Sequence, residues 1–289
     1  MRPSRSPVLW FFVFAYVITG VGACVNLLAL RRLPTDTWMP YARYLLGAGP
    51  SLAGLLMILW LYGLPGVRRL AFQLTPWSVG RAWPVLAVCL LLPLGVIVLS
   101  IGILAALGVS VPSLSWEGWS SYLYGAVIGG GLIGPGLFEE IGWRGFALPH
   151  LQRRYSALVS SLIIGLAWAF WHWPNFVIPS EPPPWWHLLA FVPLIMAVSV
   201  LFTWVYNSTG GSLFAVVLLH GAIYAASGLC DSPESGVSAR GDVVLVLLWA
   251  VIAVGLVWRY GAANLSWRDR VVAEPPNNCV NRSGESGGI

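Results

Sequence analysis

Charge is scarce in this chain, and its scarcity decides the class of protein. Only 9% of the 289 residues are charged, 57% are hydrophobic, and the mean hydropathy is +0.76. A soluble globular domain carries about 25% charged residues. These values exclude an ordinary soluble domain, and the sequence predicts a protein that is solvated mostly by lipid.

Cysteine is also scarce. The four residues Cys24, Cys89, Cys230 and Cys279 are scattered without metal-ligand spacing, so neither a disulfide framework nor a zinc–thiolate site is supported. The segment around Cys24 weakly resembles a lipoprotein cleavage site. Its apolar run is too long for a typical signal peptide and continues past the cysteine, so we predict that it is retained as a helix.

Lysine is absent, and all sixteen basic residues are arginine. With the N-terminus in the cytoplasm, twelve of them fall in inner segments, which favours cytoplasmic placement of both termini. Arg31, Arg32 and Arg43 oppose that topology, so the first hairpin stays open. The net charge of +5 is explained by membrane orientation, and no nucleic-acid partner is expected. The lysine-free, short-looped chain is typical of a multi-pass protein of a bacterial cell membrane.

Long apolar runs fill most of the sequence. A helix crosses a bilayer with about 17–25 apolar residues, and the backbone in lipid must satisfy its own hydrogen bonds. The runs lack the alternation of barrel strands. We therefore predict an all-α integral membrane protein of about eight helices in one domain, residues 1–270, followed by a disordered polar tail, residues 271–289. The predicted spans are 8–30, 44–64, 83–108, 121–138, 157–177, 187–206, 211–229 and 242–259.

Two adjacent carboxylates stand out in a chain with only 11 acidic residues. They lie in the stretch FEEIGWRG, at Glu139 and Glu140, and Arg144 follows four residues after the second. On a helix Glu140 and Arg144 share a face, whereas Glu139 points about 100° away. Arg144 can thus neutralise one carboxylate and leave the other for chemistry. An interfacial charge cluster at a helix end is the alternative.

Two histidines lie in other apolar runs. His172 follows Trp168 by four residues, so the indole can form a wall of the imidazole's pocket, and His220 precedes Tyr224 by one helical turn. Each histidine alone is compatible with simple packing. Ionisable groups inside membrane spans are costly and usually functional, so together with Glu139 they indicate a polar site that activates water. A carboxylate and two imidazoles also match a catalytic site for a divalent metal such as zinc, and both mechanisms stay open.

The motifs resemble those of the CAAX protease and bacteriocin-processing (CPBP, or ABI) family of intramembrane proteases. That family has EExxxR, then FxxxH, then a histidine followed four residues later by asparagine or aspartate. Here the first motif spans 139–144, the second spans 168–172 with tryptophan for phenylalanine, and the third begins at His220. The resemblance covers about residues 121–229. Tyr224 departs from the pattern, since it stands where the family has asparagine or aspartate.

The resemblance implies an eight-helix membrane fold and an endopeptidase that cleaves a peptide or a membrane protein. It implies Glu139 as the base that activates water, His172 and His220 as site histidines, and Arg144 as the structural partner of Glu140. Tyr224 could donate a hydrogen bond to the oxyanion from a longer reach.

Two other functions remain open: a catalytically weak immunity, scaffold or regulatory protein, and a small-molecule transporter. The sequence does not indicate an oligomeric state.

The predicted spans create one geometric conflict. Glu139 falls at the cytoplasmic end of the span 121–138, whereas His172 lies about 22 Å along the next helix at 1.5 Å per residue. We therefore predict that the helix with Glu139 continues past Arg144 and that residues 148–155 reach the cytoplasmic surface.

Overall fold

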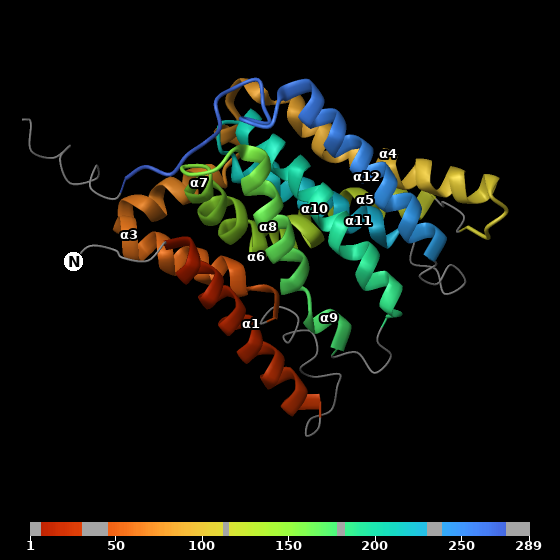
Figure 1. The fold of residues 1–289 in the computed structure, drawn as a ribbon, viewed down its shortest axis with the longest axis horizontal. Coiled ribbons are helices and arrows are strands. Elements are labelled where there is room, and N and C mark those ends of the chain that lie inside the picture. Colours follow the sequence, from red (N-terminus) through yellow and green to blue (C-terminus); the bar gives the residue numbers. More distant parts are fainter. Residues whose placement is uncertain (1–6, 31–45, 112–115, 178–182, 230–238, 276–289) are drawn as a thin grey trace, which may run out of the picture.

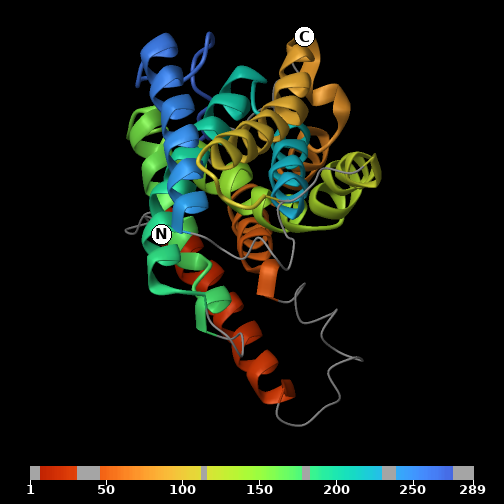
Figure 2. The same cartoon turned by 90° about the vertical axis from the view of Figure 1, so that its right-hand side faces the viewer.

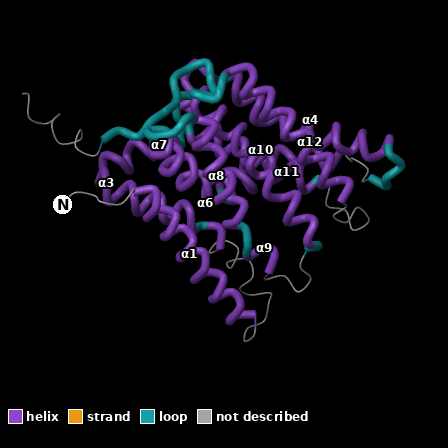
Figure 3. Tube along the Cα trace, viewed as in Figure 1, coloured by secondary structure: helices purple, strands orange, loops and turns teal. Residues whose placement is uncertain are grey.

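The computed structural model describes residues 7–30, 46–111, 116–177, 183–229 and 239–275. Helices joined by turns make up these residues, which contain no strand (Figures 1 and 3). The all-α prediction is confirmed. The turned view in Figure 2 shows the C-terminal end of α1, Pro7–Leu30, extending beyond the rest of the bundle.

Five helices in the described ranges are long and apolar enough to cross a membrane, and a bent pair brings the number to six. Two further apolar helices are shorter, α8 at Ala157–Trp171 and α11 at Leu213–Gly228. The chain is a multi-pass membrane protein, but the predicted count of eight spans is not confirmed. The five long helices are α1, α3 at Gly49–Gln73, α4 at Pro84–Ala106, α10 at Trp185–Ser208 and α12 at Ala239–Tyr260.

The predicted span 121–138 is wrong as a single straight helix. Helix α5, Trp116–Tyr124, continues into the π-helix η2, Gly125–Leu132, and the chain then bends by 43°. A new helix begins with α6, Pro135–Gly142. The break has a local cause, because proline suits the first helical position, where its missing N–H needs no partner. Glu139 thus lies near the start of a helix, not near the end of one.

That new helix continues through the π-helix η3, Trp143–Ala147, and through α7, Leu148–Leu151. The prediction that the helix runs on past Arg144 is confirmed. After a short turn the Ser156 side chain accepts a hydrogen bond from the Val159 N–H and begins α8. The resulting hairpin brings the glutamate end of α6 to the same depth as the far end of α8.

The predicted span 157–177 also divides. Helix α8 ends at Trp171, and the four-residue helix α9, Pro174–Val177, follows. A residue that precedes proline is disfavoured in the helical conformation, which accounts for the break ahead of Pro174. His172 caps the C-terminal end of α8.

Helix α11 is central to the packing around the glutamates. It lies against η2, α4 and α6, whereas α8 packs on α10 and α10 packs on α12. The turn before α11 places Gly210 and Gly211 at φ values of 68° and 94°, which glycine adopts without strain. A Cβ on Gly221 would collide with the Ala126 carbonyl oxygen, so glycine next to His220 lets α11 approach η2 closely.

The segment after α12 folds back over the end of α7 toward α3 (Figure 3). The side-chain amides of Gln152 and Asn207 bond each other, and Gln152 also donates to the Val271 carbonyl. The Ala273 N–H donates to the Pro149 carbonyl at 2.9 Å. Residues 271–275 of the predicted tail are therefore bound to the bundle, and residues 276–289 lie outside the described part of the chain.

The short 3-10 helix η1, Pro76–Ala82, connects α3 to α4. Within α3, Gly63 has a φ of 61° and produces a kink two residues before Pro65. The C-terminal half of α3 thus turns toward residues 271–275, and the Arg69 side chain bonds Glu274 at 3.0 Å.

Candidate active site

Glu140 and Arg144 form a fully buried ion pair on one face of the helix, as their spacing predicts. One terminal nitrogen of the guanidinium lies 3.0 Å from both carboxylate oxygens, and the other donates to the Ser199 hydroxyl at 3.2 Å. The guanidinium carbon also lies 4.7 Å from the Trp168 ring centroid and 4.3 Å from that of Phe202. Two aromatic faces therefore hold the cation that neutralises Glu140.

His220 binds the same carboxylate. Its Nδ1 lies 2.7 Å from Glu140 Oε1, and the side chain is buried within α11. Because the paired, ionised Glu140 can only accept a hydrogen bond, Nδ1 carries the proton. Glu140 thereby fixes the orientation of the imidazole and directs Nε2 toward the neighbouring glutamate.

Glu139 lies between the indole and this second imidazole nitrogen. Its Oε2 accepts a hydrogen bond of 2.5 Å from the Trp168 indole N–H, and its Oε1 lies 4.0 Å from His220 Nε2. Only 4% of the residue is exposed. Two hydrogen bonds of about 2.8 Å can span a gap of 4.0 Å through one water molecule at an angle of about 90°. The geometry therefore suits a water held by both side chains.

His172 joins this cluster through Trp168. Its Nδ1 lies 2.8 Å from the Trp168 backbone carbonyl, which can only accept, so Nδ1 carries the proton here as well. The ring centroid of His172 lies 5.8 Å from that of Trp168 and 5.2 Å from that of Phe191. Both histidines thus have Nδ1 bound to protein groups, which leaves Nε2 as the nitrogen available for chemistry.

Tyr224 does not join the cluster. The side chain is 52% exposed, and its ring lies beside Gly130 of η2. Among the described hydrogen bonds, none joins its hydroxyl to Glu139, His172 or His220. Tyr224 follows His220 by four residues, but His220 is buried and Tyr224 is half-exposed.

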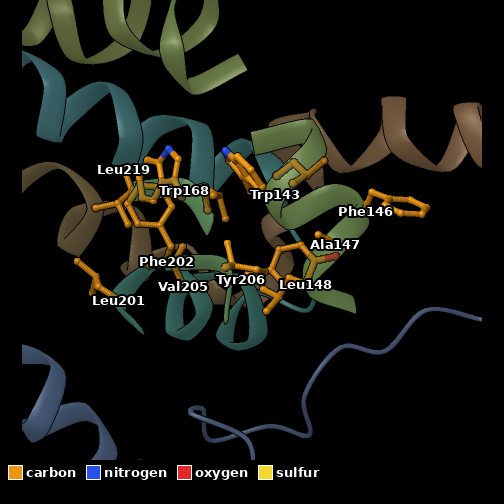
Figure 4. Packing of buried hydrophobic residues seen from close by; sticks show 14 of the residues in the cluster. Trp143, Phe146, Ala147, Leu148, Trp168, Leu201, Phe202, Val205, Tyr206 and Leu219 are labelled. Carbon is orange, nitrogen blue, oxygen red and sulfur yellow. The ribbon is translucent and has the colours of Figure 1, made fainter. Parts of the chain in front are cut away.

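Sequence reasoning missed two contributors from α10, Ser199 and Phe202. Ser199 donates its hydroxyl proton to the Ser161 carbonyl at 2.9 Å and accepts from Arg144. Phe202 packs edge-on to Trp168, as the close-up in Figure 4 shows. Small hydroxyl residues often form hydrogen bonds between helices in membranes, so the sequence weakly indicated a role for Ser199. Nothing in the sequence distinguishes Phe202 from the other apolar residues of its helix.

Glu139 and His220 are spaced more widely in this structure than two ligands of one zinc ion. Within the described ranges, no group of three or more His, Cys, Asp or Glu side chains could hold a metal ion. Oxygen and nitrogen ligands of a tetrahedral zinc, each about 2.0–2.1 Å from the metal, lie about 3.3 Å apart. The 4.0 Å between Glu139 and His220 exceeds that spacing. Metal binding by Glu139, His172 and His220 stays a prediction from sequence.

The segment that contains the site matches known proteins. Residues 119–226 match the family described as type II CAAX prenyl endopeptidase Rce1-like. Over 89 residues the chain is 30% identical to CAAX prenyl protease 2 of Methanococcus maripaludis, an alignment that covers 29% of this chain and 33% of that protein. The chain thus spans about a third of the length of this relative. The segment that holds the buried glutamates and histidines is therefore similar to the CAAX prenyl endopeptidases, whose family model it matches.

Proposed function

We propose that this protein is an intramembrane endopeptidase in which Glu139 activates a water molecule. The observation that carries the proposal is the buried 4.0 Å gap between Glu139 Oε1 and His220 Nε2. The other oxygen of Glu139 is bound to Trp168, and the other ring nitrogen of His220 is bound to Glu140. A general base must lie within hydrogen-bond reach of the proton that it removes. The gap meets that requirement for a water molecule.

In the proposed reaction Glu139 removes a proton from this water, and the hydroxide attacks the scissile carbonyl carbon. The protonated Glu139 then delivers that proton to the leaving amine nitrogen as the C–N bond breaks. His220 holds the water and is itself held by Glu140. Arg144 stays bound to Glu140, so the second carboxylate remains ionised without competing for the substrate.

The proposed substrate is a peptide or a membrane-associated protein. The printed name of the archaeal relative describes a prenyl protease, and that activity is a hypothesis for this chain. The site lies inside a bundle whose outer helices expose large apolar side chains such as Leu91, Val251 and Trp258. A substrate that approaches from the bilayer is therefore the best match to the surroundings of the site.

Cleavage by protein reconstituted in proteoliposomes tests the proposal. The probes are a quenched fluorescent peptide ending in an isoprenylated cysteine, the same peptide without the isoprenyl group, and a single-span membrane reporter. We expect cleavage by the wild-type protein and a loss of kcat of about 10³-fold in Glu139→Gln, within the usual contribution of a general base. Glu274→Gln is the matched control, because that carboxylate pairs with Arg69 at the surface.

A second function is favoured by one observation. Tyr224 replaces a polar family residue and lies half-exposed outside the cluster, which suits a catalytically weak scaffold or regulatory protein. That candidate predicts no cleavage of any of the three probes by folded wild-type protein, and equal biological function of wild type and Glu139→Gln. Faster cleavage by the wild type than by Glu139→Gln rejects it.

A further inference from the structure

Trp168 contacts four other residues of the site. Its indole N–H donates to Glu139, its ring lies 4.7 Å from the guanidinium carbon of Arg144, and its centroid is 5.5 Å from that of His220. Its backbone carbonyl binds the Nδ1 of His172. A single residue thus links the proposed base, the buried cation and both histidines.

The hydrogen bond to Glu139 is specific and not a consequence of burial. Trp143 and Trp204 are also buried, and within the described part of the chain their indole nitrogens have no hydrogen-bond partner. Burial in this bundle therefore does not force an indole to find an acceptor. The N–H of Trp168 nevertheless lies 2.5 Å from a carboxylate oxygen, and hydrogen bonds to a charged acceptor are shorter and stronger than those between neutral groups.

The bond also distinguishes the two oxygens of Glu139. Oε2 is occupied by the indole, and Oε1 is the oxygen near His220 Nε2. The terminal torsion of the carboxylate is intrinsically broad. A half-turn only exchanges two equivalent oxygens, whereas an intermediate rotation would take both oxygens out of these positions and break the bond. The indole therefore holds Oε1 toward the gap in which the proposed water lies.

We infer that Trp168 is a positioning residue that fixes the carboxylate of Glu139 through its indole N–H, so that Oε1 is directed at the water shared with His220. The inference rests on the proposed function. It assigns a role to Trp168, which stands where the family motif has phenylalanine. A phenyl ring keeps the apolar wall but has no donor for Glu139.

Trp168→Phe tests the inference, because it removes the donor and keeps a ring over Arg144. The backbone carbonyl that binds His172 is unchanged. Trp171→Phe is the matched control: it lies on the same helix, is equally buried, and loses an indole hydrogen bond of 2.7 Å to the Thr19 hydroxyl. Both variants and the wild type are compared for kcat, KM and apparent Tm with whichever probe the wild type cleaves.

We expect Trp168→Phe to lower kcat by about tenfold with KM changed by less than about twofold, since misplaced reacting groups cost rate without weakening binding. Trp171→Phe should keep kcat within about twofold of the wild type, while its apparent Tm falls by about as much as that of Trp168→Phe. Equal kcat values for the two variants, or a change in KM alone for Trp168→Phe, would overturn the inference.

Trp168→Phe changes the size of the ring as well as removing the donor, and a second variant separates the two effects. Site-specific incorporation of 3-benzothienylalanine at position 168 keeps the bicyclic shape and replaces the N–H with sulfur. The same tenfold loss of kcat supports the inference, and wild-type kcat overturns it. Glu139→Gln separates this result from the proposed function: an active Glu139→Gln rejects the proposed function itself, whereas an inactive Glu139→Gln beside a fully active Trp168 variant rejects only the positioning role.

Discussion

Replacing Arg144 by methionine should destabilise the protein severely, because the change leaves the fully buried Glu140 without its cation. The guanidinium makes two 3.0 Å contacts to that carboxylate and lies over the rings of both Trp168 and Phe202. Breaking a buried ion pair by removing one partner costs about 3–5 kcal/mol. The loss of two desolvated cation–π contacts places the expected cost toward the upper end of that range.

The double variant Glu140→Gln/Arg144→Met should recover most of this loss, since a buried pair replaced as a unit leaves no unpaired charge. The free energy of unfolding is measured by titration with SDS in mixed micelles for the two single variants and the double variant. Arg69→Met is the matched control, because it breaks a half-exposed Arg–Glu pair that should contribute no more than about 1 kcal/mol. A loss of less than about 1 kcal/mol in Arg144→Met, or a double variant no more stable than that single one, would refute the reasoning.

Three further predictions concern the surroundings of the site. Tyr224→Phe should keep kcat within about twofold of the wild type, because the half-exposed residue lies outside the cluster. A tenfold loss in the cleavage assay would restore its role as an oxyanion donor. Treatment with EDTA or 1,10-phenanthroline should leave cleavage unchanged if Glu139 and His220 alone hold the water, and inhibition reversed by added zinc would instead support the metal site predicted at Glu139, His172 and His220. Gly221→Ala should lower the apparent Tm and kcat together, because its Cβ would collide with the Ala126 carbonyl and push α11 away from η2; Gly255→Ala, where a Cβ meets open space, is the control and should keep both values.

Most of the architecture was predictable because a helix that crosses lipid requires a long apolar run, which is visible in the sequence. The predicted spans at the two ends of the chain agree with α1 and α12 to within a few residues. The predicted span 44–64 ends nine residues too early, because α3 continues through Pro65 to Gln73. Two other errors fall where local backbone chemistry divides an apolar run. Pro135 and Pro174 each start a new helix inside a predicted span, and hydropathy alone does not register a break between two equally apolar segments.

The site was predictable in its residue types and less so in its contacts. The spacing of Glu140 and Arg144 correctly predicted an ion pair on one helical face. The prediction that Trp168 would serve as a wall for His172 captured only its ring contact. Its hydrogen bond to Glu139 depends on how α6 and α8 pack, and no periodicity within either helix contains that information.

The central claim is that Glu139 and His220 act on one shared water, and a double-mutant cycle on kcat tests it most directly. Glu139→Gln removes the base, and His220→Asn removes Nε2 while keeping an N–H donor for Glu140. Groups that act as a unit show strongly non-additive losses. We predict that the double variant is no slower than Glu139→Gln alone, whereas rate losses that multiply would show that the two side chains act independently and would contradict the account.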